Sequence, residues 1–132
     1  MQRRVLVIDD DAQTRTLVTA LLEPAGYAVR SADGAVAGLG LANAELPDVV
    51  VLDVQMPGMD GYEVCRRLRA GPRTQRIPII MLTASDDPGL NRQAYAAGAQ
   101  ACVPKPFRRE GLVATIEAVL AGRPLEEPKV GG

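Results

Sequence analysis

The fold is decided by the stretch Val5-Leu6-Val7-Ile8-Asp9-Asp10-Asp11 and its counterpart Val49-Val50-Val51-Leu52-Asp53. Each is a short apolar run that ends in acid. Strands that are hydrophobic along their whole length are buried on both faces, as in a parallel sheet covered by helices. The carboxyl ends of such strands share one edge of the sheet, so the acids that follow them can converge. Clustered carboxylates repel one another and are hard to hold together without a cation. The pattern therefore predicts an acidic, metal-binding pocket with one aspartate placed to react.

Composition limits the classes of protein to which the chain can belong. Its 132 residues suffice for one domain, and an apolar content of 47% is ordinary for a globular protein. A net charge of −1 gives no long-range attraction to nucleic acid or anionic lipid. No apolar run approaches the roughly 18 residues of a membrane span, and residues 1–4 lack the apolar stretch of a signal peptide. We therefore expect a cytoplasmic protein that contacts neither membrane nor nucleic acid directly.

Histidine is absent from the sequence, and only two cysteines are present. The lack of histidine excludes a histidine-based catalytic triad, most zinc sites and a self-contained histidine phosphorelay. Cys65 and Cys102 lie far apart in sequence and are too few for a disulfide framework. We expect both to be reduced, small residues of the core.

The hydrophobic pattern predicts strand and helix in alternation. Strands are expected at residues 4–8, 27–32, 49–52, 77–82 and 101–103. Helices are expected to follow them, the first with Leu17, Val18, Leu21 and Leu22, and the second at about 33–43. The third is expected to begin at about residue 60, with Val64 and Leu68 facing the core, and the last two are expected at about 86–98 and 107–121. Their candidate N-caps are Asp33, Asp60 and either Asp86 or Asp87. In the third helix, Arg66, Arg67 and Arg69 are expected to face water.

This alternation predicts an α/β fold, a doubly wound, flavodoxin-like parallel sheet of five strands with helices on both faces. With the strand order 2-1-3-4-5, the chain reverses direction between the first and third strands and opens a crevice there. Asp9, Asp10 and Asp53 would lie at its mouth. Residues 1–122 form the predicted domain, and 123–132 read as a flexible C-terminal tail or truncated linker.

Two more polar residues reach the same predicted edge. Thr83 follows the fourth strand, and Lys105 follows the fifth. Taken alone, a threonine at a strand end is usually a local hydrogen-bonding group, and a lysine is usually a solvated charge. An acidic run before a helix is likewise often a simple N-cap. The joint pattern is more specific, because each of four apolar strands is followed by one of these groups: an acid pair, a single acid, a hydroxyl and an ammonium.

With these residues in place, the chain resembles the receiver domains of two-component response regulators over roughly residues 3–122. The resemblance is carried by the segments Val7-Ile8-Asp9-Asp10-Asp11, Leu52-Asp53-Val54-Gln55-Met56-Pro57-Gly58-Met59-Asp60-Gly61, Met81-Leu82-Thr83-Ala84 and Lys105-Pro106-Phe107. It implies that Asp53 accepts a phosphoryl group from a histidine of a partner kinase. It also implies a Mg²⁺ ion bound by Asp10, Asp53 and the backbone carbonyl of Gln55, with Asp9 helping through water. Thr83 and Lys105 would contact the phosphoryl oxygens.

The chemistry of these side chains agrees with those roles. A carboxylate can attack phosphorus when its charge and that of the donor are screened. Mg²⁺ commonly binds one or two carboxylates together with a phosphate. Transfer of a phosphoryl group needs mainly positioning and neutralisation of its oxygens, which Mg²⁺ and Lys105 would supply. The resemblance also favours a cis peptide bond between Lys105 and Pro106.

The chain departs from the family pattern at Cys102, where relatives often carry an aromatic residue three positions before the lysine. Cysteine is too small to report a movement of Thr83 as a ring does, so Cys102→Tyr is expected to alter partner affinity upon phosphorylation. Gln55 and Ser85 occupy positions that flank the path of the hydrolytic water in the resembled family. They are either determinants of phosphoryl lifetime or ordinary polar loop residues.

Three classes of function follow from these residues. The leading one is a phosphorylation-controlled interaction switch rather than an enzyme. Its partners would be a sensor histidine kinase or histidine phosphotransfer protein, a downstream effector domain or protein, and a second copy in a phosphorylation-dependent dimer. The alternatives are an unphosphorylated structural module and a Mg²⁺-dependent aspartyl-phosphate phosphatase. The haloacid-dehalogenase type of phosphatase favours an aspartate two positions after its nucleophile, and here that residue is Gln55.

Overall fold

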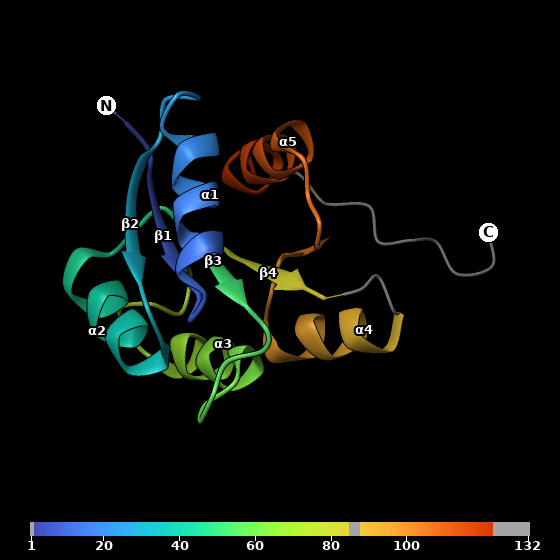
Figure 1. Cartoon of the computed structure of the whole chain (residues 1–132). Coiled ribbons are helices and arrows are strands. Elements are labelled where there is room, and N and C mark those ends of the chain that lie inside the picture. Colours follow the sequence, from blue (N-terminus) through green and yellow to red (C-terminus); the bar gives the residue numbers. More distant parts are fainter. Residues whose placement is uncertain (1, 85–87, 123–132) are drawn as a thin grey trace.

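The computed structural model describes residues 2–84 and 88–122, in which strands and helices alternate (Figure 1). The strands are β1 (Arg4–Ile8), β2 (Ala28–Ala32), β3 (Val49–Asp53), β4 (Ile79–Thr83) and β5 (Ala101–Pro104). The helices are α1 (Ala12–Leu22), α2 (Ala35–Glu45), α3 (Gly61–Ala70), α4 (Pro88–Ala97) and α5 (Arg109–Leu120). The boundaries agree with the sequence prediction to within a few residues. The predicted tail at 123–132 lies outside the described residues.

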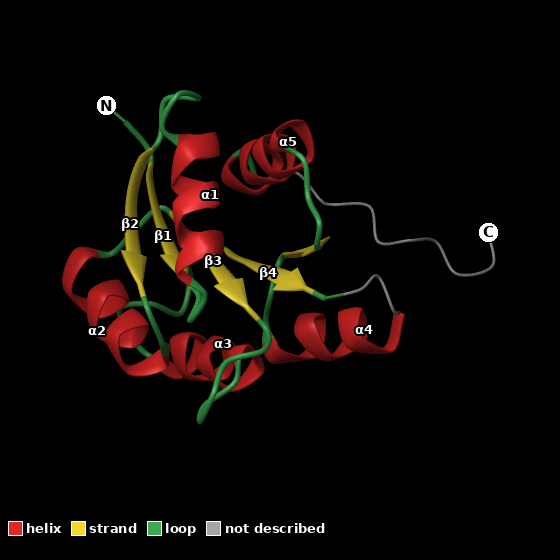
Figure 2. Ribbon diagram, in the orientation of Figure 1, coloured by secondary structure: helices red, strands yellow, loops and turns green. Residues whose placement is uncertain are grey.

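The strands form one parallel sheet in the order β2-β1-β3-β4-β5, which confirms the predicted topology. Figure 2 shows α1 and α5 on one side of this sheet and α2, α3 and α4 on the other. Because all strands run in the same direction, their carboxyl ends lie at one edge. The direction in which successive strands are added to the sheet reverses between β1 and β3, so a ligand site is favoured between their carboxyl ends.

The core consists of two layers, one on each face of the sheet. Val5 and Val7 of β1 pack into the layer beneath α1 and α5, whereas Leu6 and Ile8 pack into the opposite layer. This alternation follows from the two-residue period of a strand. Both faces of β1 and β3 are therefore buried, which explains the unbroken apolar runs 5–8 and 49–52 within them.

The predicted N-caps have different outcomes. Asp60 caps α3, accepting a hydrogen bond from the Glu63 amide through Oδ1 at 2.9 Å, as expected. The prediction for Asp33 was wrong, because the N-cap of α2 is Gly34, with no side-chain cap bond. The N-cap therefore lies one residue after the acid, and the helix begins at Ala35. Asp86 and Asp87 lie outside the described residues.

Arg69 also differs from its prediction, because it does not face water. Its guanidinium donates to the carbonyls of Gly98, Gln75 and Ile77 at 2.7–3.0 Å and to Gln100 Oε1 at 2.6 Å. It therefore ties the end of α3 to the loops before β4 and β5. The reason is tertiary, because the acceptor oxygens come from loops that the sequence of α3 alone does not place beside this arginine.

Both cysteines are free thiols, Cys65 in the core and Cys102 half-buried. In the described part of the chain, no helix is long and apolar enough to cross a membrane.

Candidate functional site

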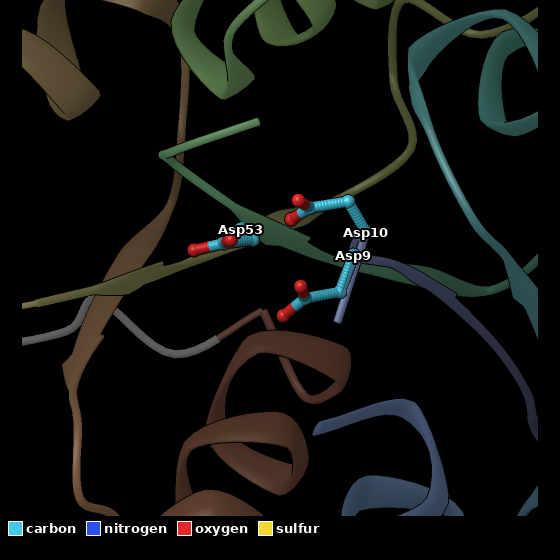
Figure 3. Close-up of side chains that lie close together, drawn as sticks. All are labelled: Asp9, Asp10 and Asp53. Carbon is cyan, nitrogen blue, oxygen red and sulfur yellow. The ribbon is translucent and has the colours of Figure 1, made fainter. Parts of the chain in front are cut away.

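The register of the sheet brings two predicted acids together. Ile8 pairs with Leu52 in the parallel ladder between β1 and β3, so the next residues, Asp9 and Asp53, are neighbours at the edge. Asp10 follows in the same turn, and one carboxylate oxygen from each of the three residues lies within 4.8 Å of the other two. Figure 3 shows the three side chains converging from the ends of β1 and β3. The predicted acidic pocket thus exists as a geometric cluster.

Lys105 brings a positive charge into this cluster. Its Nζ lies 3.2 Å from Asp53 Oδ1 and 3.5 Å from Asp9 Oδ2. The lysine is placed by the ladder between β4 and β5, where its amide donates to the Thr83 carbonyl at 2.7 Å. The Lys105–Pro106 bond is cis, as the resemblance suggested. Thr83 itself is buried at the end of β4.

Asp9 is fully buried, and one of its oxygens has no hydrogen-bond partner. Oδ1 accepts from the Asp11 amide at 2.9 Å, whereas Oδ2 accepts no hydrogen bond and has only the 3.5 Å ion pair with Lys105. Burial raises the pKa of Asp9 from 3.8 to about 6, and the charges of Asp53 and Asp10 add to the rise, whereas the Asp11 amide and Lys105 oppose it. A cation among the three carboxylates would offset this repulsion and the lack of a hydrogen bond at Asp9 Oδ2. The residues present therefore fit a metal ion with hard oxygen ligands.

Gly61 allows α3 to approach the loop that follows Asp53. A Cβ at this position would overlap the Asp53 carbonyl oxygen and lie 2.8 Å from Val54 Cα, and the Gly61 amide donates to the Val54 carbonyl at 2.8 Å. Only glycine fits against this backbone. Within the same loop, Gly58 has φ +80°, a left-handed conformation that suits the tight turn after Pro57. The side chain of Gln55 is exposed in this loop.

A cavity of about 530 Å³ adjoins the pocket between the loops that follow β3 and β4. It is lined by Val54, Gln55, Met56, Pro57, Asp60, Tyr62, Thr83, Ala84 and Leu90. The Tyr62 hydroxyl donates to the Leu90 carbonyl at 3.3 Å and so links α3 to α4. Burial raises the pKa of the nearby Cys102 thiol to about 11, so this cysteine is protonated at neutral pH. Ser85 lies outside the described residues.

One residue of the pocket had no signal in the sequence. The Arg15 guanidinium donates to the backbone carbonyl of Asp9 at 2.8 Å, from six residues along the chain. Neither the hydrophobic period nor the family motifs distinguish this arginine from those on the surface. The contact arises because α1 folds back beside the end of β1.

Residues 5–117 match the family model described as the response regulator receiver domain. A curated relative, the DNA-binding dual master transcriptional regulator RpaA of Synechocystis sp., is 41% identical over 117 residues, which are 89% of this chain and 48% of RpaA. Protein PilH of Pseudomonas aeruginosa is 38% identical over 119 residues, which are 90% of this chain and 98% of PilH. The chain thus spans about half of one relative and nearly all of the other.

A solved structure, a putative response regulator from Chloroflexus aurantiacus, superposes with a TM-score of 0.89 at 36% identity, covering 92% of this chain and 99% of that one. Family match, relatives and fold agree. The chain belongs to the response regulator receiver domain family.

Proposed function

We propose that Asp53 is the phosphoacceptor of this receiver domain. It would receive a phosphoryl group from a phosphohistidine on a sensor histidine kinase or a histidine phosphotransfer protein. The observation that carries the proposal is the position of Asp53, which lies 3.2 Å from the Lys105 ammonium and within the cluster that contains Asp9 and Asp10. A carboxylate so placed has both a neutralising cation and a site for a second one.

The transfer step follows from these groups. An oxygen of Asp53 attacks the phosphorus, a P–O bond forms, and the P–N bond to histidine breaks with its electron pair left on the imidazole nitrogen. Lys105 then neutralises charge on the phosphoryl group, and Thr83 donates a hydrogen bond to one of its oxygens. The protein would act as a phosphoacceptor that assists its own phosphorylation and slow dephosphorylation, not as an enzyme with a separate substrate.

Mg²⁺ is the metal that the donor set favours. Asp10, Asp53 and the Gln55 backbone carbonyl would hold it, with Asp9 acting through water. When bound, Mg²⁺ supplies positive charge to the phosphoryl oxygens. The raised pKa of the buried Asp9 carboxyl and the lack of a hydrogen bond at its Oδ2 support this assignment, because a nearby cation would offset the cost of the buried charge.

The phosphoryl group would add about two negative charges to this edge of the sheet and so change affinity for other proteins. We infer a downstream effector domain or protein as the target, with phosphorylation-dependent dimerisation as one form of the response. Direct nucleic-acid contact by residues 1–122 and membrane association are not part of the proposal. We place the protein in the cytoplasm, with 123–132 as a tail or the start of a linker.

Intact mass after incubation with a small acyl phosphate tests the acceptor. We expect one added phosphoryl group that requires both Mg²⁺ and Asp53. Asp53→Asn should abolish the adduct, whereas the control Asp48→Asn should not, because Asp48 contacts Arg3 and Arg4 at the opposite edge of the sheet. An adduct that persists in Asp53→Asn would identify another nucleophile. A folded protein with no adduct at short and long times would favour the unphosphorylated structural module, and continuous turnover would favour the phosphatase.

A further inference from the structure

The acidic pocket is braced by a side chain that the proposed phosphoryl chemistry does not use. Arg15, in the first turns of α1, is half-buried and donates through Nη1 to the Asp9 carbonyl at 2.8 Å. This hydrogen bond ends on a backbone oxygen of the pocket and not on a carboxylate. Arg15 can therefore act on the pocket by fixing the position of the main chain at Asp9.

The acceptor carbonyl belongs to the peptide unit that joins Asp9 to Asp10. A peptide unit is planar, so a bond to its oxygen fixes the plane from which the Asp10 side chain projects. Two further bonds hold the same turn. The Asp9 amide donates to the Ala32 carbonyl at 3.1 Å, and the Asp11 amide donates to Asp9 Oδ1 at 2.9 Å. Arg15 adds the restraint that comes from the side of α1.

The charge of Arg15 has little direct effect on the carboxylate cluster. The groups that oppose the raised pKa of Asp9 are the Asp11 amide and the Lys105 ammonium. Lys105 reaches the carboxylates directly, at 3.2 Å and 3.5 Å. Arg15 instead contacts the pocket at a main-chain oxygen, the Asp9 carbonyl. A bond to a neutral carbonyl orients that group and changes the charge of the cluster little.

We propose that Arg15 is a positioning residue, which holds the Asp9–Asp10 peptide unit in the orientation where three carboxylates converge. It would thereby set the affinity of the pocket for a divalent cation and, through that cation, the rate at which Asp53 accepts a phosphoryl group. This inference rests on the proposed function and adds to it a residue that touches neither metal nor phosphate.

Three variants isolate the effect. Arg15→Met keeps the aliphatic stem and removes the donors, and Arg15→Lys keeps the charge and one donating group. The matched control is Arg4→Met, because Arg4 Nη2 donates to the Leu46 carbonyl at 2.9 Å at the opposite edge of the sheet. Isothermal titration with Mg²⁺ gives the affinity, urea unfolding in EDTA gives the stability, and mass spectrometry gives the rate of acceptance.

We expect Arg15→Met to bind Mg²⁺ about tenfold more weakly than the wild type, the low end of the effect of residues that orient metal ligands. Arg15→Lys should recover part of this loss, and Arg4→Met should bind Mg²⁺ as the wild type does. The difference between Arg15→Met and wild type should persist at about 1 M salt, where charges are screened beyond about 3 Å.

Several results would overturn the inference. They are wild-type Mg²⁺ affinity in a folded Arg15→Met, a loss in Arg15→Lys equal to that in Arg15→Met, and a difference that disappears at high salt. A wild-type protein that binds no Mg²⁺ and accepts no phosphoryl group would instead refute the proposed function itself. The two failures are therefore distinguishable.

Discussion

Replacing Asp9 with asparagine should stabilise the metal-free protein at neutral pH. The carboxyl group is fully buried, and burial raises its pKa from 3.8 to about 6. This rise in pKa corresponds to a free energy of roughly 3 kcal/mol, at about 1.4 kcal/mol for a tenfold change in the proton equilibrium. That free energy is the cost of keeping the buried group ionised in the folded state. Asparagine removes the ionisation and keeps an oxygen that can accept from the Asp11 amide, so we expect a gain of about 1–3 kcal/mol at pH 7.5.

The size of the effect depends on pH. Below about pH 4, Asp9 is protonated in both folded and unfolded states, so the two proteins should differ little in stability. Between about pH 4 and pH 6 the folded state retains a proton that the unfolded state has released, so this group's contribution to wild-type stability falls as pH rises. Above pH 6 the full cost applies. The advantage of Asp9→Asn should therefore grow across this window and then level off.

Urea unfolding in EDTA, followed by far-ultraviolet circular dichroism between pH 4 and pH 8, measures this advantage. Asp48→Asn is the control, because Asp48 accepts a favourable bond from the Arg4 amide at 2.7 Å and its loss should not stabilise the protein. Mg²⁺ should raise the stability of the wild type by mass action and narrow its gap to Asp9→Asn. An Asp9→Asn protein that is no more stable than wild type at pH 7.5, or equally more stable at pH 4, would refute the reasoning.

Two further predictions concern packing around the site. Gly38→Ala should destabilise the folded protein by about 1–3 kcal/mol, because the new Cβ would lie 2.6–2.8 Å from three side-chain atoms of the buried Ile8. Gly40→Ala has no atom within 4 Å of its new Cβ and should stabilise α2 by about 0.5–1 kcal/mol. Urea unfolding midpoints in the opposite order would contradict this packing. Tyr62→Phe removes the 3.3 Å bond to the Leu90 carbonyl and should cost about 0.5 kcal/mol. Hydrogen exchange should then quicken in α4 but not in α2, and unchanged exchange in α4 would show that the bond does not hold this helix.

The sequence predicted the fold well because its strongest signals were also local ones. Apolar runs such as Val49–Leu52 can be read as buried strands, and the acid after each run then lies at the sheet edge. Parallel register converts that placement into contact between Asp9 and Asp53. The positions of Thr83 and Lys105 follow from the same rule.

The residues that escaped prediction are those whose role depends on distant neighbours. Arg69 resembles its exposed neighbours in α3 until the loops before β4 and β5 are placed beside it. Arg15 meets the Asp9 carbonyl only after α1 has folded back. Asp33 was mistaken for a cap because a one-residue difference in the start of a helix leaves no clear trace in sequence.

The contact between Gly61 and the backbone of Asp53 determines the direction in which the pocket can respond to new charge. With no side chain between them, the first turn of α3 rests directly on the main chain of Asp53, the proposed phosphoacceptor. On the other flank, Asp53 is paired with Leu82 in the ladder with β4. The main chain at Asp53 therefore has α3 packed on one side and β4 on the other, and it has little room to move. We therefore expect a phosphoryl group on Asp53 to move side chains such as Thr83 and Lys105, which lie at the carboxyl edge of the sheet.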